Sequence, residues 1–591
     1  ENAMFNNYFA GAQVIEIIVK DPNRINTNEQ VSEPTVKVNE FPIRMAQGAD
    51  GYWYAYVAET AEVALATANA NLDYGTQAAA TGITFNSAIT PYHTSAVIGQ
   101  APTLSIIDID GGFDDGTESG QIGVTPGQWP FLQTLDFTLE NIDIKLEQAG
   151  TDEVVSLKHD NDDIDDYSSV ELDRNSATFG AEVHLTVTDQ ALNIDPTTED
   201  VVMFKVDSSY GVSFKHDSTA TSGNYAAFDN GFDDNGQLKI NYGANDATKP
   251  VLVNEATLDD ETADNYLIFF ETAENSGIFV NTDDDDDSNL NVNTSALTAR
   301  GTTATIDYAD SAQSFTIVHD FATIDMDASS VGDEWNSGEE MTIVLYDQDL
   351  NLNTFKDEDL TVAGGTLVPS IQVGSPVSTS STATTISGSN TAINTATQHL
   401  FSKITNADIS AGDTTLVINT GLTGADVYAI AATYNSFNVD VSSFGTISNV
   451  EVCEVDTYAD GQTCATAGAL SLLDTVTTTG KFHDELTTAA SNDADEDIIV
   501  EVTLSSSAAQ TDAPFVIDFF SFSESENNAI YRIELEETGD NTATFEGSAE
   551  YVMLNQINYN LDATYDGVNP TQDDVDMIVH LDMTDEDSIR V

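Results

Sequence analysis

Hydrophobic and polar residues alternate in many short segments along the chain. Segments that alternate with a period of two and end in clusters of Asp, Asn, Gly, Ser or Thr are typical of β-strands. The clearest ten are residues 13–20, 34–41, 52–59, 181–188, 237–243, 303–309, 314–320, 340–347, 437–443 and 531–537. Helical periodicity is scarce, with residues 58–75 as its best example. The pattern therefore predicts an all-β protein built from β-sandwiches or barrels.

Two pairs of segments are similar to each other within the chain. GAEVHLTVTDQALNID, which starts at Gly180, aligns with GEEMTIVLYDQDLNLN from Gly338. LIFFETAENSGIF, from Leu267, aligns with IELEETGDNTATF from Ile533 at a larger offset. The second copy therefore contains an insertion, which is long enough to form a small domain of its own.

These repeats predict the domain organisation. A length of 591 residues allows about three to six domains. We expect an N-terminal sandwich, a second sandwich, a third sandwich that is split in the sequence, and a β module inserted into the third. Their predicted ranges are 1–150, 151–325, 326–376 with 491–591, and 377–490. Because the last residues still show a strand-rich pattern, we expect the natural protein to continue beyond Val591.

The repeated motifs suggest turns. In D-Q-x-L-N, Asp189 and Asn193 are placed to bond nearby backbone amides, as are their counterparts Asp347 and Asn351. The alternative for each Asp/Asn pair is a role as metal ligands. His184 alternates with apolar neighbours and is expected to face solvent, whereas Trp53 is expected in a core. The E-T-x-x-N motif, repeated with Asn275 and Asn541, is expected to support a further tight turn.

The charge balance is extreme. Asp and Glu total 100 and Lys and Arg total 17, which gives a formal net charge of -83. Nucleic-acid binding is excluded, because contacts to phosphate need clustered Lys and Arg, and docking on anionic lipid is disfavoured. A disordered acidic chain would lack the 40% hydrophobic content found here. We therefore expect a folded protein with an anionic surface, which adaptation to salt would also explain.

Several acidic clusters are candidate sites for Ca²⁺ or another divalent cation, which binds oxygen ligands. The first two share a G-F-D-D core and contain Asp108, Asp110, Asp114, Asp115, Glu118, Asp229, Asp233 and Asp234. The others contain Asp162, Asp163, Asp165, Asp166, the run 283–287, Asp493, Asp495 and Asp497. None of these clusters matches an EF-hand loop. The alternative is a set of solvated acidic loops, and no organic cofactor is expected.

The two cysteines, Cys453 and Cys464, flank a short loop rich in turn residues. In an extracellular protein we expect a disulfide between them, with two free thiols as the alternative. The first residues lack the pattern of an uncut signal peptide, so we interpret the chain as already processed. No apolar run is long enough to span a membrane. Asn293 lies in the N-glycosylation sequon that we identify.

Enzyme signatures are missing from the sequence. It contains no H-E-x-x-H, G-x-S-x-G, P-loop or G-x-G-x-x-G motif and no zinc-type Cys/His cluster. The eight histidines are scattered, and paired carboxylates are unavoidable among so many acids. We therefore expect a protein that is not an enzyme, and an extracellular hydrolase adapted to high salt is the least favoured interpretation.

Four segments together resemble the surface-layer (S-layer) proteins of ammonia-oxidising archaea. They are residues 13–59, residues 177–200, residues 335–360, and the pair ETAENSGIF and ETGDNTATFEG. The resemblance implies strings of immunoglobulin-like domains that self-assemble into a porous sheet, usually hexagonal, on the cell surface. It also implies an extracellular, glycosylated protein without enzymatic activity.

The strongly negative net charge suggests what a coat of this kind would do. Pores lined by carboxylates attract cations and repel anions, so we expect a coat that favours ammonium. Divalent cations are expected between neighbouring copies, because like charges otherwise repel. The alternative is an acidic, Ca²⁺-dependent cell-surface adhesin or stalk of immunoglobulin-like domains that presents the inserted module to a partner.

Overall fold

The computed structural model divides the chain into two compact units, Glu1–His319 and Asp320–Val591. The boundary lies close to the one expected after residue 325. The structure describes residues 7–10, 13–29, 31–59, 132–135, 141–160, 164–193, 196, 199–207, 213–216, 238–242, 251–254, 266–288, 290–294, 299–309, 311–332, 334–366, 369–373, 377–378, 385–388, 392–393, 405–424, 434–456, 463–464, 471–476, 481–485, 496–506, 508–522, 527–553, 571–579 and 591.

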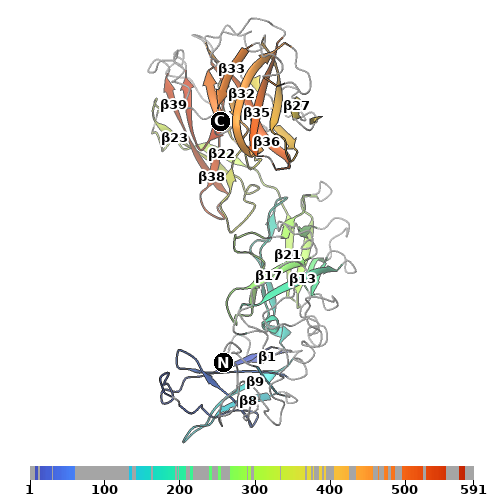
Figure 1. The fold of residues 1–591 in the computed structure, drawn as a ribbon, viewed down its shortest axis with the longest axis vertical. Helices are drawn as coiled ribbons and strands as arrows, with labels where there is room; N and C mark the ends of the chain where they lie inside the picture. The colour runs from blue at the N-terminus through green and yellow to red at the C-terminus, as the bar shows by residue number, and fades with distance from the viewer. Residues whose placement is uncertain are drawn as a thin grey trace. The chain divides into compact units, whose positions relative to one another are not determined.

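The first unit begins with two small sheets that share one core (Figure 1). One sheet has the order β1 (Tyr8–Phe9), β9 (Glu153–His159), β8 (Asn141–Leu146), β3 (Val36–Val38), β4 (Phe41–Ile43). The other has the order β2 (Ile15–Val19), β6 (Trp53–Glu59), β5 (Ala46–Gln47), with β7 (Leu132–Leu135) on β6. Alternate residues of both sheets, including Ile17, Val36 and Ile142, are buried between them. Trp53 lies in this core, as the sequence predicted.

The described residues in the rest of the first unit form three more sheets. One has the order β10 (Ser169–Leu172), β12 (Leu185–Thr188), β18 (Ile278–Val280), β17 (Tyr266–Glu271), β13 (Val201–Asp207), β14 (Ser213–His216). The others are β11 (Ser176–Ala177), β21 (Ser311–Ile317), β20 (Thr303–Tyr308), β15 (Leu238–Tyr242), and the pair β16 (Leu252–Asn254), β19 (Leu290–Val292). Two 3₁₀ turns, η2 (Asp165–Tyr167) and η3 (Gln190–Leu192), connect strands. The alternation in β20 buries every second residue, so the period of two in the sequence corresponds to one buried face.

The part of the second unit that the structure describes forms three sheets. The first is β22 (Thr323–Met326), β23 (Glu340–Tyr346), β39 (Thr544–Met553), β38 (Leu535–Glu537), β24 (Asp359–Leu360), with β41 (Asp574–Val579) on β39. The second has the order β25 (Ser370–Val373), β37 (Asn527–Ile533), β36 (Gln510–Phe522), β31 (Tyr434–Asp440), β34 (Lys481–Glu485). In addition, β26 (Val377–Ser378) and β29 (Thr405–Ile409) pair with β36, and β40 (Thr571–Gln572) pairs with β37. The third is β28 (Ala392–Ile393), β27 (Thr385–Gly388), β30 (Thr415–Thr423), β35 (Asp497–Ser506), β32 (Thr446–Val455), β33 (Ser471–Val476). A 3₁₀ turn, η8 (Ser442–Phe444), follows β31.

The core of the inserted region extends past residue 490, where we expected the insertion to end. Val500 of β35 and Phe515 of β36 are buried in the same cluster as Phe437 and Val450. The second sheet then continues from β36 into β37, which belongs to the core of the split sandwich. The inserted region is therefore joined to its host by a continuous sheet.

The described structure is an all-β arrangement of many small, mostly antiparallel sheets, as the sequence predicted. Each of the ten alternating segments contains at least one strand. Of the helix expected at 58–75, Ala58 and Glu59 belong to β6, and the remaining residues lie outside the described part. Within the described residues, we find no helix with the length and apolar character that crossing a membrane requires.

Candidate functional site

Most of the predicted acidic sites fall outside the described residues. This holds for Asp108, Asp110, Asp114, Asp115, Glu118, Asp229, Asp233, Asp234, Asp162, Asp163, Asp493 and Asp495. Asp165 and Asp166 lie in η2, and Asp497 begins β35. The sites built on G-F-D-D therefore stay predictions.

The run of five aspartates, residues 283–287, forms a surface turn before β19. The Asp283 carboxylate accepts hydrogen bonds from the backbone N–H groups of Asp285 and Asp287, both at 3.0 Å. Asp286 has a φ of 64°, which short polar side chains tolerate better than most. Asp284, Asp285 and Asp286 are exposed. This geometry is that of a solvated Asx turn, which is the alternative we considered for this cluster.

The D-Q-x-L-N and E-T-x-x-N motifs meet in both repeats. In the first unit the Asn193 amide donates to Asn275 Oδ1 at 3.0 Å. In the second unit the Asn351 amide donates to Asn541 Oδ1 at 2.9 Å. The repeated asparagines therefore join two turns by the same hydrogen bond in each copy.

The aspartates of these motifs accept hydrogen bonds within the fold. Asp189 accepts from the Ala191 backbone at 2.8 Å and from the Tyr308 hydroxyl at 2.5 Å. Asp347 accepts from the Asp349 backbone at 3.0 Å. These contacts favour the structural role, which was the first of the two interpretations for the Asp/Asn pairs.

A repeated glutamate stabilises the same turn, and the sequence did not reveal this role. Glu271 accepts hydrogen bonds from the backbone N–H groups of Ser276 and Gly277, at 2.7 and 2.8 Å. Glu537 accepts from those of Thr542 and Ala543, at 2.8 and 2.6 Å. Each glutamate thus satisfies backbone donors of a tight turn at a buried position. The repetition of Glu-Thr in both copies was the available signal.

In the second unit this glutamate has a carboxyl neighbour. Glu358 accepts hydrogen bonds from the backbone N–H groups of Leu352 and Asn353, at 2.9 and 2.5 Å, and its own N–H donates to Glu537 at 3.3 Å. Burial, together with the adjacent Glu537 carboxylate, raises the pKa of Glu358 to about 8. Glu358 therefore carries a proton near neutral pH, because two adjacent carboxylates repel each other in a partly desolvated site.

The disulfide predicted from the sequence is present between Cys453 and Cys464. Asn293 is partly buried and its backbone N–H donates to the Val251 carbonyl at 2.9 Å, whereas Thr294 of the sequon is exposed. Glycosylation of Asn293 stays a prediction.

The expectation for His184 was wrong. Its side chain is 3% exposed, and its Nδ1 lies 2.8 Å from the Thr282 hydroxyl. The histidine is therefore buried beside a polar partner, Thr282, which lies on a distant segment. The alternation of residues along one strand cannot reveal such a partner.

The first sheet of the second unit presents acids to solvent in rows across its strands. Asp359 of β24 pairs with Glu536 of β38, which pairs with Glu546 of β39, and all three are exposed. Three further acids form a second row, because Glu550 of β39 lies between Glu340 of β23 and Asp576 of β41. Residues directly opposite on adjacent strands have Cβ atoms about 5 Å apart. The strand register therefore concentrates these carboxylates on one sheet face.

Like charges oppose each other on this acidic sheet face. The pKa of Glu536 is raised by desolvation and by neighbouring carboxylates, of which Asp359 is the strongest. The pKa of Asp576 is raised by desolvation and by Asp574. Repulsion between neighbouring carboxylates therefore adds to desolvation in raising both pKa values. Hard cations with oxygen ligands suit this chemistry.

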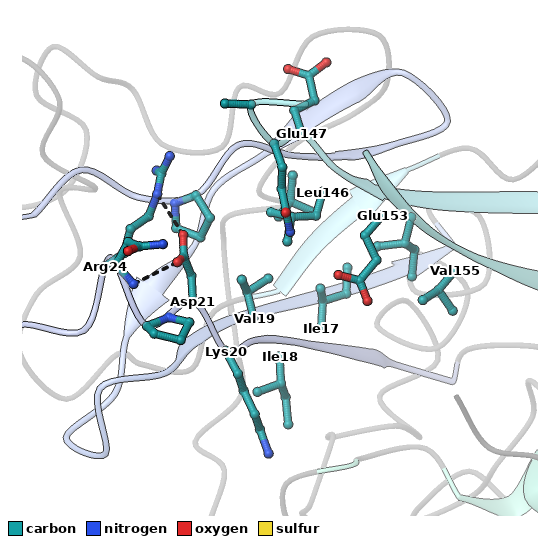
Figure 2. Close-up of a pocket in the computed structure, with 17 residues that line it drawn as sticks. Ile17, Ile18, Val19, Lys20, Asp21, Arg24, Leu146, Glu147, Glu153 and Val155 are labelled. Atoms are coloured by element: carbon teal, nitrogen blue, oxygen red, sulfur yellow. Dashed lines mark hydrogen bonds and ion pairs between the residues drawn. The ribbon is translucent and has the colours of Figure 1, made fainter. Parts of the chain in front are cut away.

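A pocket of about 700 Å³ lies in the first unit between β2 and the sheet that contains β3 and β8. Figure 2 shows Arg24 and Asp21 joined on one side of the pocket, with Glu153 on the opposite side. The Arg24–Asp21 ion pair is 3.2 Å long, and Glu147 on the rim pairs with Lys37 at 2.7 Å. The floor is apolar, and the lining contains no His, Cys or Ser. Its polar side chains are partly engaged in ion pairs with each other or with residues at the rim.

Comparisons with known proteins add little. The chain matches no protein-family model and no curated protein. Among solved structures it is similar to an Escherichia coli alpha-2-macroglobulin activated by porcine elastase, with 10% identity and a TM-score of 0.11. The match covers 54% of this chain and 28% of that chain. A likeness this weak carries no argument about fold or function.

Proposed function

We propose that this protein is a structural component of a cell-surface layer, which assembles through its own copies into a porous, anionic sheet. The sheet acts as a protective coat and admits cations, ammonium among them, in preference to anions. The observation that supports this most is the net charge of -83 on a chain of β-sandwiches. The resemblance of four segments to archaeal S-layer proteins supports the same proposal.

The acidic sheet face shows how such a charge can be arranged. Asp359, Glu536 and Glu546 lie side by side on rigid strands, so their charges cannot move apart as they would in a flexible loop. Fixed carboxylates of this kind attract counterions and focus the field inside a narrow opening. The Debye length falls from about 10 Å to about 3 Å between 0.1 and 1 M salt. The selectivity therefore acts inside narrow pores and not far from the sheet.

Assembly of such a polyanion requires neutralisation. Two faces that both carry carboxylates repel each other unless cations lie between them, and Ca²⁺ accepts six to eight oxygen ligands. We therefore propose that divalent cations are part of the assembled layer and bridge neighbouring copies. The runner-up function is an acidic, Ca²⁺-dependent adhesin or stalk, in which the same cations only stiffen a single molecule.

Negative-stain electron microscopy of the purified protein, with and without calcium, tests the proposal. We expect ordered two-dimensional sheets that form with calcium and dissolve when it is chelated. Isolated rods under all conditions would favour the adhesin and contradict the layer. A variant with Glu536→Gln, Glu546→Gln and Asp359→Asn tests the contribution of these three acids alone. It should change the calcium concentration that sheet assembly requires, without unfolding the β-sheet that carries the three residues.

A further inference from the structure

A sheet edge in the first unit borders the pocket described above. Within the described part of the chain β2 pairs only with β6, so its other side carries no strand partner there. Unpaired strand edges of this kind readily accept a strand from another chain. Figure 2 shows Ile17 and Val19 pointing from β2 toward Leu146 across the pocket, whose floor is apolar. We call this edge and the pocket beside it the β2 groove.

The β2 groove is close to neutral, unlike the chain as a whole. The chain has 17 Lys and Arg residues against 100 Asp and Glu, but two cations, Lys20 and Arg24, line the groove. Three acids line it with them: Asp21, Glu147 and Glu153. Lys20 is exposed, contacts the Tyr52 ring at 4.8 Å, and takes part in none of the ion pairs found among the described residues. An acidic partner is therefore repelled less here than over a purely acidic surface.

A second exposed edge lies at the start of the second unit. β22 pairs only with β23 among the strands that the structure describes. Phe321, just before β22, is 87% exposed, and Ile324 within β22 is 42% exposed. The acids Asp320 and Asp325 flank them and are exposed as well. Exposed apolar side chains on an unpaired strand edge indicate a docking surface.

The β2 groove and the β22 edge complement each other. The groove offers an unpaired strand, an apolar hollow of about 700 Å³ and the ammonium group of Lys20. The β22 edge offers an unpaired strand, two exposed apolar side chains and two exposed carboxylates. When a strand is added to a sheet edge, main-chain hydrogen bonds provide affinity and side-chain pockets provide specificity. Both contributions are available to this pair of surfaces.

We propose that the β2 groove of one copy docks the β22 edge of a second copy. Phe321 and Ile324 enter the apolar hollow, and Asp325 approaches Lys20. Because the contact joins two unlike surfaces, it repeats from copy to copy and builds an extended array. The inference rests on the proposed self-assembly and names one of its interfaces. In contrast to the cation bridges, this interface needs no divalent ion.

Disulfide cross-linking between two variants of the full chain tests the contact. The native cysteines are bonded to each other, so an introduced cysteine supplies the only free thiol. Ile18→Cys and Ile324→Cys are mixed with calcium chelated, in sodium chloride that screens the long-range repulsion between copies. The two side chains are 43% and 42% exposed, so neither substitution opens a core.

Phe355→Cys is the matched control for Ile324→Cys. Phe355 is 45% exposed and precedes β24, at the opposite edge of the sheet that contains β22. We expect Ile18→Cys to cross-link with Ile324→Cys about tenfold more than with Phe355→Cys, because docking raises the effective concentration of the two thiols. Adding Phe321→Ala to the Ile324→Cys chain should remove most of this difference.

Charge reversal gives a second readout, in the self-association measured by sedimentation velocity under the same conditions. Lys20→Glu should weaken self-association by about tenfold, because it places like charges opposite each other. Adding Asp325→Lys should restore the association. Asp540→Lys is the control for this rescue, since Asp540 is exposed elsewhere and the substitution changes the net charge by the same amount.

The inference is overturned if both cysteine mixtures cross-link equally, or if Asp540→Lys rescues Lys20→Glu as well as Asp325→Lys does. Such a result leaves the proposed layer standing, provided that calcium still produces ordered sheets. Specific cross-linking in a protein that forms no sheets with calcium would instead support this contact and contradict the layer.

Discussion

At the scale of single residues, a half-buried carboxyl group links the stability of this protein to pH. Glu358 lies against Glu537 in the second unit, and its pKa is raised to about 8 from an ordinary value near 4.5. The folded protein therefore holds an extra proton between these pH values. By linkage, this group favours folding most below about pH 4.5, and its contribution is lost as the pH rises through about 8.

Glu358→Gln should remove this pH dependence. A glutamine can still accept from Leu352 and Asn353, and its amide can donate to Glu537, so the repulsion between carboxylates disappears. We expect the free energy of unfolding at pH 8 to 9 to rise by about 1–2 kcal/mol, after allowance for the partial exposure of the site. Denaturant unfolding between pH 5 and 9 measures it. An unchanged pH profile in the variant would contradict the assignment.

The disulfide should stabilise the inserted region. Cys453 and Cys464 are separated by 11 residues, and closing a loop of this size lowers the entropy of the unfolded chain. Replacing both cysteines by serine should cost about 3 kcal/mol. Thermal unfolding of the variant, with the reduced wild type as a second comparison, measures the loss. Equal stability of all three proteins would show that the bridge does not constrain the fold.

Local sequence predicted some residue roles and missed others for a physical reason. The disulfide, the core position of Trp53 and the turn role of Asp189 follow from near neighbours in the chain. Glu358 meets a partner 179 residues away. The partner of His184 is likewise distant, so alternation along its own strand gave the wrong orientation. Long-range pairing decides these cases.

At the scale of elements, the alternation predicted strands but not their partners. β23 is the repeat counterpart of β12, and it pairs with β39 as β12 pairs with β18, although β39 lies beyond the whole inserted region. The acidic rows depend on this register, because a shift of one residue would turn the acids to the other face. The sequence therefore indicated an anionic surface without showing which acids lie side by side.

The acidic row across β24, β38 and β39 should destabilise its sheet at low salt. Like charges directly opposite on adjacent strands are unfavourable. We expect Glu536→Gln to raise the free energy of unfolding by a few tenths of a kcal/mol at low ionic strength. The gain should shrink in high salt because of screening. Denaturant titrations at several salt concentrations measure it.

Asp540→Asn is the control for this prediction. Asp540 lies exposed in the turn between β38 and β39, outside the strand-paired row. If this substitution stabilises the protein as much as Glu536→Gln, general net charge and not the register is responsible.

A buried ion pair lies beside the junction between the inserted region and its host. Arg532 of β37 contacts Asp518 of β36 at 2.8 and 3.1 Å, and both side chains are 1% exposed. Arg532→Met would leave Asp518 buried without its partner, so we expect a loss of about 3–5 kcal/mol. Adding Asp518→Leu should restore most of the stability. Thermal unfolding of both variants measures this, and a mild single variant would contradict the role of the pair.

At the scale of the whole molecule, the account rests on charge. A chain with a net charge of -83 repels its own copies, so the proposed assembly and its proposed selectivity would both require cations. Composition alone predicted the sign and size of this charge. The symmetry of a layer and the acids that line its pores depend on contacts between copies, which one chain does not specify.

The measurement that tests this central claim most directly is ion permeation through assembled sheets of the purified protein. Ammonium and nitrite have the same magnitude of charge and opposite sign, so their relative permeation reports the sign of the field in the pores. We predict that ammonium passes faster than nitrite, and that the difference shrinks as salt rises. Equal permeation of the two ions at low salt, or faster passage of nitrite, would contradict the account.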